Sequence, residues 1–139
     1  MFRHVGIVVK DLEKQLQFYR DYLGLEVYYS QIEKGKFLEN LIGYSNVEPL
    51  IYKLGKNNNI IVELLYFKDY ENVNNKKLIN NGITHFALTI ENLDELYILL
   101  KSKGINFINP PELSDDKKHK VCFCQDYDLN YVELVEKMK

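Results

Sequence analysis

The sequence contains an internal repeat in which one pattern occurs twice along the chain. In each copy a histidine opens an apolar, strand-like run, and the tripeptide Val-Glu-Leu follows further on. The first copy runs from His4 to Glu63 and the second from His85 to Glu133. A repeat of this length indicates that one supersecondary unit is built twice and that the two units share one architecture.

A helix is expected after the first apolar run of each copy. In the first copy Asp11 is a polar cap before an apolar stripe at helical spacing, and Gly24 is suited to end the helix in a left-handed conformation. In the second copy Asn92 is the expected cap, Glu95 is placed to complete a capping box, and Gly104 ends the stripe. The histidines and the closing glycines stay in register to within one residue between the copies.

Extended runs follow each helix. They begin at 25–29 in the first copy and at 105–108 in the second, and they end with 60–67 and 131–135. Each copy therefore reads as strand, helix and three strands. An additional segment at 34–43 is expected to form a short helix or a flap.

The 139 residues are expected to form a single domain made of two modules. Module one covers 1–68 and module two covers 82–139. The connector between them, 69–81, is rich in Asn and Lys and leads into Asn81-Gly82, a turn signal.

Composition and charge exclude two classes of function. The net charge is −2 and the lysines are interleaved with acidic residues, so no nucleic-acid-binding face is expected. No apolar run reaches the roughly 18–20 residues of a membrane-spanning helix, so no membrane association is expected. Because His4 lies close behind Met1, no cleavable signal is expected before it, and the cytoplasm is the expected location.

The cysteines and the third histidine have less specific patterns. Cys122 and Cys124 are spaced C-x-C on an expected strand, which favours two buried free thiols over a soft-metal or redox pair. His119 is expected in a solvated loop, with a structural or substrate-side role.

Strand alternation places the two repeat histidines away from their own helices. His4 and His85 each share that face with small residues, Gly6 and Ala87 among them. Such a face is expected to be the concave side of a curved sheet, where a cavity can exist.

The repeat glutamates lie on strands that are apolar on both faces. Both strands are therefore expected to be central, with Glu63 and Glu133 buried. A buried, ionised carboxylate without a partner costs several kcal/mol. Taken singly, each of the four residues is more typical of a structural or surface role. Together, at equivalent positions of a repeat, the two imidazoles and two carboxylates favour an octahedral or open tetrahedral metal site.

At these residues the chain resembles the vicinal oxygen chelate superfamily, which includes glyoxalase I, methylmalonyl-CoA epimerase, extradiol dioxygenases and bleomycin-resistance proteins. The resemblance is most specific over 4–13 and 18–25, and 126–130 is similar to the family's Asp-Pro-Asp-Gly-Asn turn with Pro and Gly replaced. It implies an α+β fold in which two βαβββ modules form an incomplete, curved β-barrel around a metal site. Carried over by position, the metal ligands would be His4, Glu63, His85 and Glu133.

The resemblance also implies an activity. A glyoxalase-type, divalent-metal-dependent isomerase or lyase would transfer a proton next to a carbonyl through a metal-bound enediolate. Glu133 would be the base, with Glu63 as a ligand or second base. The expected cofactor is one divalent metal per site, with nickel, cobalt or zinc favoured over iron or manganese. The expected substrate is a small molecule with vicinal oxygens.

Two other functions remain open at this point. An extradiol-type non-haem iron dioxygenase would use three protein ligands, and a drug-sequestering binding protein would usually lack the ligands. Glutathione-using glyoxalases carry an arginine four residues after the first ligand and an asparagine four residues after the second, where this chain has Val8 and Phe67. The glutathione clamp is therefore missing from the pattern, which favours a less polar or aromatic substrate.

A homodimer is expected to cover the open side of the curved sheet, as in the family that the chain resembles. The candidate interface residues are the tyrosines Tyr28, Tyr29, Tyr44, Tyr52, Tyr66 and Tyr70.

Overall fold

The computed structural model describes residues 2–69, 77–79 and 81–139. The chain divides into two compact units, Met1–Val73 and Asn74–Lys139. The division falls inside the predicted connector, most of which (70–76 and 80) lies outside the described residues, as does Tyr70. That the two modules form one domain stays a prediction.

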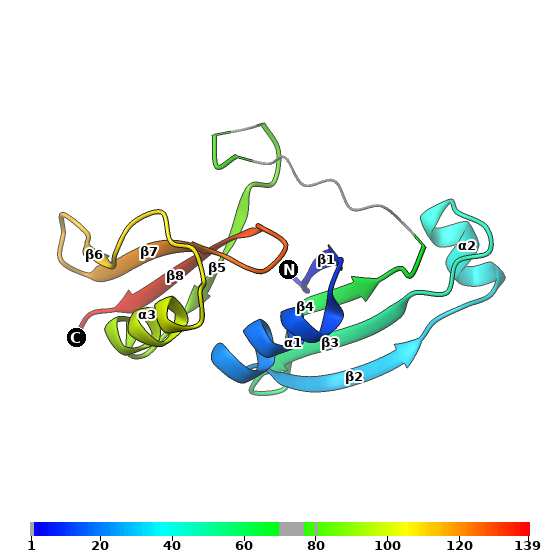
Figure 1. Cartoon of the computed structure of the whole chain (residues 1–139), viewed down its shortest axis with the longest axis horizontal. Coiled ribbons are helices and arrows are strands. Elements are labelled where there is room, and N and C mark those ends of the chain that lie inside the picture. The colour runs from blue at the N-terminus through cyan, green and yellow to red at the C-terminus, as the bar shows by residue number, and fades with distance from the viewer. Residues whose placement is uncertain (1, 70–76, 80) are drawn as a thin grey trace. The chain divides into compact units, whose positions relative to one another are not determined.

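The first unit is an open, four-stranded sheet with helices (Figure 1). Its elements are β1 (Val5–Val9), α1 (Leu12–Leu16) with its π-helical continuation η1 (Gln17–Tyr22), β2 (Glu26–Ile32), α2 (Lys36–Ile42), β3 (Leu50–Lys56) and β4 (Asn59–Tyr66). The strand order is β1-β4-β3-β2, and only the β1–β4 pair is parallel. The predicted extra segment is therefore the helix α2.

The second unit repeats this strand order, with one helix after its first strand. Its elements are β5 (His85–Thr89), α3 (Leu93–Ser102), β6 (Glu112–Leu113), β7 (His119–Gln125) and β8 (Tyr131–Lys137). The strand order is β5-β8-β7-β6, again with a parallel first pair. The predicted α+β class with two βαβββ modules is confirmed.

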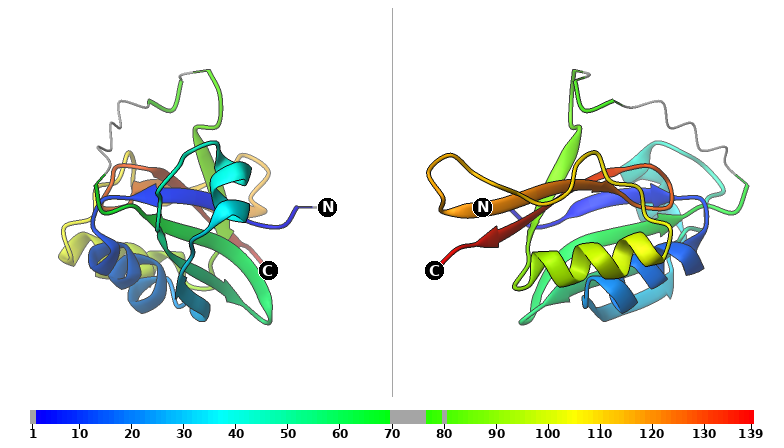
Figure 2. Two further views of the ribbon diagram at one scale, coloured as in Figure 1. Left: turned by 90° about the vertical axis from the view of Figure 1, so that its right-hand side faces the viewer. Right: turned by 60° about the vertical axis from the view of Figure 1, so that its left-hand side comes forward.

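Each unit has its own core between a helix and one face of its sheet (Figure 2). Helix α1 packs on β4 and α3 packs on β8. Burial of a large aliphatic or aromatic side chain contributes about 1.5–3 kcal/mol, so these contacts hold the helices in place. The fully buried residues include Val9, Phe18, Tyr19, Leu54, Val62 and Leu64 in the first unit and Leu93, Leu100, Cys122, Cys124, Val132 and Leu134 in the second.

Helix ends follow the predictions except at one cap. Asp11 Oδ1 accepts a hydrogen bond from the Lys14 amide at 3.1 Å, and Gly24 and Gly104 have φ of 70° and 79°. The prediction of a capping box at Asn92 is wrong, because the Asn92 side chain makes no capping hydrogen bond within the described part of the chain.

The amide at the start of α3 is instead bound by a carboxylate from the sheet. Leu93 N donates to Glu136 Oε2 on β8 at 3.1 Å. A carboxylate satisfies an otherwise unpaired amide and is stabilised by the positive end of the helix dipole, so a tertiary contact replaces the local cap.

Two further predictions for the second unit are corrected. The run 105–108 forms an isolated bridge between Phe107 and Cys124 instead of a strand, and β6 follows only after Pro110-Pro111. Proline has no amide hydrogen and interrupts a ladder. His119 does not lie in a loop, because it is the first residue of β7, and its backbone amide donates to Ser114 Oγ at 3.1 Å.

The β3–β4 hairpin determines which side chains share a face in the first unit. Its turn residues Asn57 and Asn58 have φ of 52° and 61°, as in a type I′ turn. The register then shifts by one residue between Leu54 and Gly55, which is a β-bulge. A Cβ at Gly55 would lie 1.8 Å from the carbonyl oxygen of Asn59, so only glycine fits this close approach.

Both cysteines are free and fully buried, as predicted. Burial raises the pKa of the Cys122 thiol to about 11 and raises that of Cys124 further, so neither is a reactive thiolate at neutral pH.

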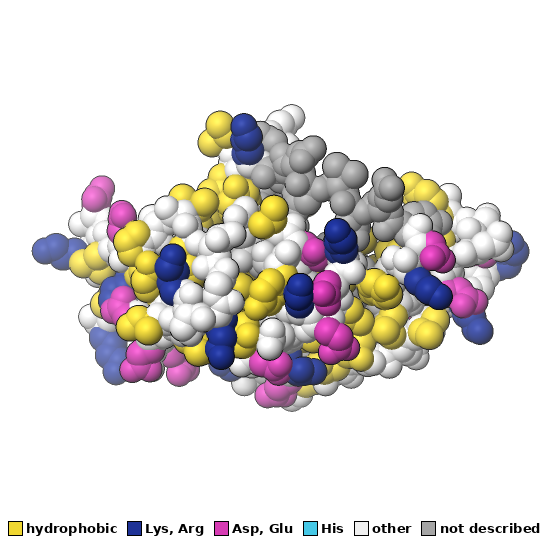
Figure 3. All heavy atoms as spheres, in the orientation of Figure 1, with side chains coloured by type: hydrophobic (Ala, Val, Ile, Leu, Met, Phe, Trp, Pro, Cys, Tyr) yellow, Lys and Arg dark blue, Asp and Glu magenta, His cyan; other side chains and the backbone are white. Residues whose placement is uncertain are grey.

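No helix of the described residues is long and apolar enough to cross a membrane. Acidic and basic side chains are interspersed over the face shown in Figure 3.

Candidate functional site

One row of residues crosses the first sheet and carries a predicted ligand. Gly6 on β1 is the register partner of Glu63 on β4, Glu63 that of Lys53 on β3, and Lys53 that of Tyr29 on β2. Val62 and Leu64 point into the core beneath α1, so the side chains of this row lie on the opposite face of the sheet. Strand pairing therefore brings a carboxylate, an ammonium group and an aromatic ring side by side.

Glu63 is bound through both of its carboxylate oxygens. Its Oε2 lies 3.2 Å from His4 Nε2, and its Oε1 lies 3.2 Å from Lys53 Nζ. The side chains of Glu63 and Glu133 are 16% and 25% exposed, so both glutamates are half-buried and the prediction that they are buried is wrong. The cation of Lys53 supplies the compensating charge that such a carboxylate needs.

Lys53 is itself held in place by an aromatic neighbour. Its Nζ lies 4.8 Å from the centroid of the Tyr29 ring, within the range of a cation–π interaction. The Tyr29 hydroxyl donates to Glu33 Oε1 at 2.9 Å. Burial and this hydrogen bond raise the pKa of Tyr29, so the ring stays neutral beneath the ammonium group.

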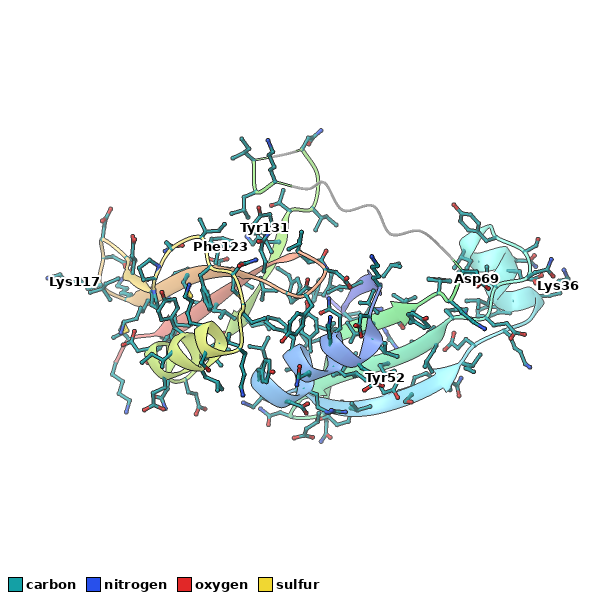
Figure 4. All side chains as sticks on the ribbon, in the orientation of Figure 1. Lys36, Tyr52, Asp69, Lys117, Phe123 and Tyr131 are labelled. Atoms are coloured by element: carbon teal, nitrogen blue, oxygen red, sulfur yellow. The ribbon has the colours of Figure 1, made fainter. Side chains whose placement is uncertain are left out.

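The second unit repeats the His–Glu pair in different surroundings. His85 Nε2 lies 3.5 Å from Glu133 Oε2. The register partner of Glu133 on β7 is Phe123, whose ring meets that of His85 edge-on with centroids 5.0 Å apart. Figure 4 labels Phe123 on β7 and Tyr131 at the start of β8. The position that holds Lys53 in the first unit therefore holds an aromatic ring in the second.

The histidines differ in the use of their other ring nitrogen. His85 Nδ1 lies 3.0 Å from Thr84 Oγ1, which fixes the ring and orients Nε2 toward Glu133. Nδ1 of His4 is buried, and it has no hydrogen-bond partner among residues 2–69, 77–79 and 81–139.

Small residues beside the glutamates leave room near the carboxylates. A Cβ at Gly6 would lie 3.8 Å from Glu63 Oε2 and 3.5 Å from Leu65 Cδ1, which are ordinary contact distances. Ala87 is the register partner of Glu133 in the second unit. Neither position carries a side chain large enough to shield the neighbouring carboxylate.

The structure pairs the predicted site residues within each unit, His4 with Glu63 and His85 with Glu133. In the portion of the chain that the structure describes, no cluster of three or more His, Cys, Asp or Glu side chains suitable for a metal is present. Lys53 was missed by sequence reasoning. Its signal is the alternation of β3, which places it opposite Glu63 once the bulge at Gly55 is counted.

A family model for the Glyoxalase/Bleomycin resistance protein/Dioxygenase superfamily matches residues 3–136. The chain belongs to this superfamily. The resemblance found in the sequence is thereby confirmed, and the repeated βαβββ unit is the superfamily's module.

Relatives within the superfamily carry glyoxalase names. The chain is 29% identical over 140 residues to the lactoylglutathione lyase of Schizosaccharomyces pombe, covering 95% of this chain and 46% of that protein. It is 26% identical over 134 residues to a probable lactoylglutathione lyase of Synechocystis, covering 96% of this chain and 92% of that protein. The chain thus spans about half the length of the yeast relative and nearly all of the cyanobacterial one.

Solved structures of the superfamily have the same fold. A glyoxalase family protein from Bacillus cereus superposes with a TM-score of 0.89 at 17% identity, covering 99% of this chain and 94% of the other. A glyoxalase family protein from Enterococcus faecalis gives a TM-score of 0.65 at 26% identity, covering 98% and 97%.

Proposed function

We propose that this chain is a divalent-metal-dependent lyase or isomerase of the glyoxalase type. It transfers a proton next to a carbonyl group of a small molecule with vicinal oxygens. The observation that carries the proposal is the repetition of one His–Glu pair on equivalent strands of the two units. Relatives named lactoylglutathione lyase support the same class of reaction.

The pairs suit a shared cation in distance and chemistry. Two ligands with bonds near 2.1 Å and angles between 90° and 109° lie about 3.0–3.4 Å apart. The His–Glu separations of 3.2 and 3.5 Å are close to this range. Imidazole nitrogen and carboxylate oxygen suit zinc, nickel and cobalt, and also iron and manganese. The residues that would hold one metal are His4, Glu63, His85 and Glu133.

The surroundings of the two glutamates support different roles. A bound metal would act as a Lewis acid toward the substrate oxygens. Glu63, whose second oxygen is tied to Lys53, would remain in place as a ligand. Glu133, which faces Phe123 instead of a cation, would remove the proton next to the carbonyl and return it on the neighbouring carbon.

The substrate is proposed to be less polar than a glutathione adduct. Val8 and Phe67 occupy the positions where glutathione-using relatives have a charged and an amide side chain, and Val8 is 47% exposed. An apolar side chain there cannot bind the glycyl or glutamyl carboxylates of glutathione. A hemithioacetal of a small neutral thiol is expected to be turned over at least as well as that of glutathione.

Metal content measured by inductively coupled plasma mass spectrometry on untagged, anaerobically purified protein tests the proposal. About one equivalent of nickel, cobalt or zinc supports it. Stoichiometric ferrous iron favours the dioxygenase instead. Absence of metal even after reconstitution points to a small-molecule-sequestering protein and contradicts the four-ligand site.

The Glu63→Gln variant then distinguishes a metal site with four protein ligands from one with three. It should abolish metal retention in a four-ligand site and only weaken it in a three-ligand site. Glu39→Gln is the matched control, because Glu39 is also ion-paired with a lysine, Lys36, at 2.7 Å in the same unit. The predicted homodimer is tested on the same samples by size-exclusion chromatography with light scattering.

A further inference from the structure

In the first unit a lysine is ion-paired with the proposed metal ligand Glu63. Lys53 Nζ lies 3.2 Å from Glu63 Oε1, while Glu63 Oε2 lies 3.2 Å from His4 Nε2. We propose that Lys53 is an internal competitor for the metal at Glu63, which restricts this carboxylate to one-oxygen ligation and lowers the affinity of the site for divalent cations. This inference rests on the proposed function.

The position of Lys53 is fixed by its surroundings. Its side chain is 24% exposed, the ammonium group lies against the Tyr29 ring, and the Tyr29 hydroxyl is bound by Glu33. Most surface lysine ion pairs lose side-chain entropy on forming and are worth little. A lysine packed on a ring, in register with its carboxylate, has already lost that freedom and holds its partner more strongly.

Electrostatics gives the direction of the effect. A divalent cation and an ammonium group that share one carboxylate repel each other, and at a partly solvated site this changes binding by roughly tenfold. Without a metal, the opposite charges of Glu63 and Lys53 compensate each other. A metal that binds Glu63 must therefore either share the carboxylate with the Lys53 ammonium group or displace that group.

Occupation of Oε1 also predicts selectivity among cations. Calcium takes many oxygen ligands and often both oxygens of one carboxylate, whereas zinc accepts a single oxygen in a tetrahedral site. With Oε1 held by Lys53, Glu63 offers one oxygen. The lysine therefore favours zinc-like ions over calcium.

The test is isothermal titration of the metal-free full chain with zinc and with calcium, comparing the parent with Lys53→Met. We expect the variant to bind zinc roughly tenfold more tightly, with a larger gain for calcium. Lys53→Arg, which keeps the charge, should bind no more tightly than the parent. Lys53→Gln, whose side chain is one atom shorter and keeps a hydrogen-bond donor without the charge, is the second variant and should also gain affinity.

Lys36→Met is the matched control, because it removes one positive charge from an ion pair in the same unit whose lysine is 87% exposed (Figure 4). It should leave both affinities unchanged.

The outcomes separate this inference from the proposed function. A parent that binds zinc together with Lys53→Met and Lys53→Gln variants that bind it equally or more weakly overturns the role of Lys53 and leaves the metal enzyme standing. If neither the parent nor the variants bind metal, both proposals fail. If the parent binds zinc weakly and the Lys53→Met variant binds it tightly, the result supports the proposal that Lys53 competes with the metal for Glu63.

Discussion

The two units of this chain carry the same His–Glu pair in opposite electrostatic settings. Glu63 faces a lysine across the sheet, whereas Glu133 at the equivalent position faces the ring of Phe123. One carboxylate is thereby compensated by a fixed cation, and the other has a histidine and an aromatic ring as neighbours. A repeat can thus retain one His–Glu pair while the residues around it give each copy a different electrostatic environment.

The hairpins that present these glutamates also differ. The β3–β4 hairpin has a two-residue Asn-Asn turn and a bulge, whereas β7 and β8 pair without a register shift around the turn 126–130. In the latter, buried Asp126 accepts the amides of Asp128 and Asn130 at 2.9 Å each. Two different turns reach the same result, a carboxylate on the face away from the helix.

The largest expected effect separates the roles of the two carboxylates. Glu133→Gln should lower turnover of a hemithioacetal substrate by roughly 10²–10⁴-fold, because an amide cannot accept the proton. The assay is done at saturating metal, with metal content measured on the same sample. Glu112→Gln, on the exposed β6, is the control. Full turnover by Glu133→Gln would show that the base lies elsewhere.

The next effect concerns the β-bulge at Gly55 in the first unit. Gly55→Ala should destabilise the fold by about 2–3 kcal/mol, because its Cβ would collide with the backbone of Asn59. Urea unfolding followed by circular dichroism measures this. Gly6→Ala is the control, since its Cβ meets only ordinary contacts. Equal stabilities of the two variants would contradict the close approach.

A lysine placed in the second unit should copy the first. Phe123→Lys, which puts an ammonium group opposite Glu133, should weaken zinc binding by roughly tenfold through charge repulsion. Phe37→Lys on α2, a position that is 81% exposed, adds the same charge elsewhere and should leave the affinity unchanged. Tighter zinc binding by Phe123→Lys would contradict the claim that a lysine opposite the glutamate weakens metal binding.

The smallest effect lies in the turn 126–130. Leu129 has φ of 63°, a conformation that costs a side-chain-bearing residue about 1–2 kcal/mol. Leu129→Gly should raise the stability by about 0.5–1 kcal/mol, since part of the relief is offset by the greater freedom of glycine in the unfolded chain. Asn58→Gly in the first unit should change less, because asparagine tolerates positive φ. Thermal unfolding compares the two, and a loss of stability in Leu129→Gly contradicts the strain.

Much of the fold could be predicted because its signals are local. The alternation of apolar residues predicted the strands except at 105–108, and Asp11, Gly24 and Gly104 predicted helix ends that the structure contains. The sequence also singled out the four repeat residues, and the structure brings them together as two pairs, because β1–β4 and β5–β8 join the two ends of each module. That the two pairs share one metal stays a prediction.

The missed features depend on contacts between distant residues. A plain two-residue hairpin would pair Lys53 with Val62 and point it into the core, and the bulge moves the partner to Glu63. The cap of α3 comes from Glu136, more than forty residues away, and local propensity favoured Asn92. Such contacts depend on register, which is set by the packing of the whole unit.

Strand β8 carries two carboxylates with separate duties. Glu133 belongs to the face of the His–Glu pair, while Glu136, three positions on, points to the other face and binds the first amide of α3. A one-residue slip of β8 exchanges the faces of both residues at once. A misregistered copy therefore loses the hydrogen bond that anchors α3 together with the His85–Glu133 pair, so one strand register determines both the placement of the helix and the geometry of the pair.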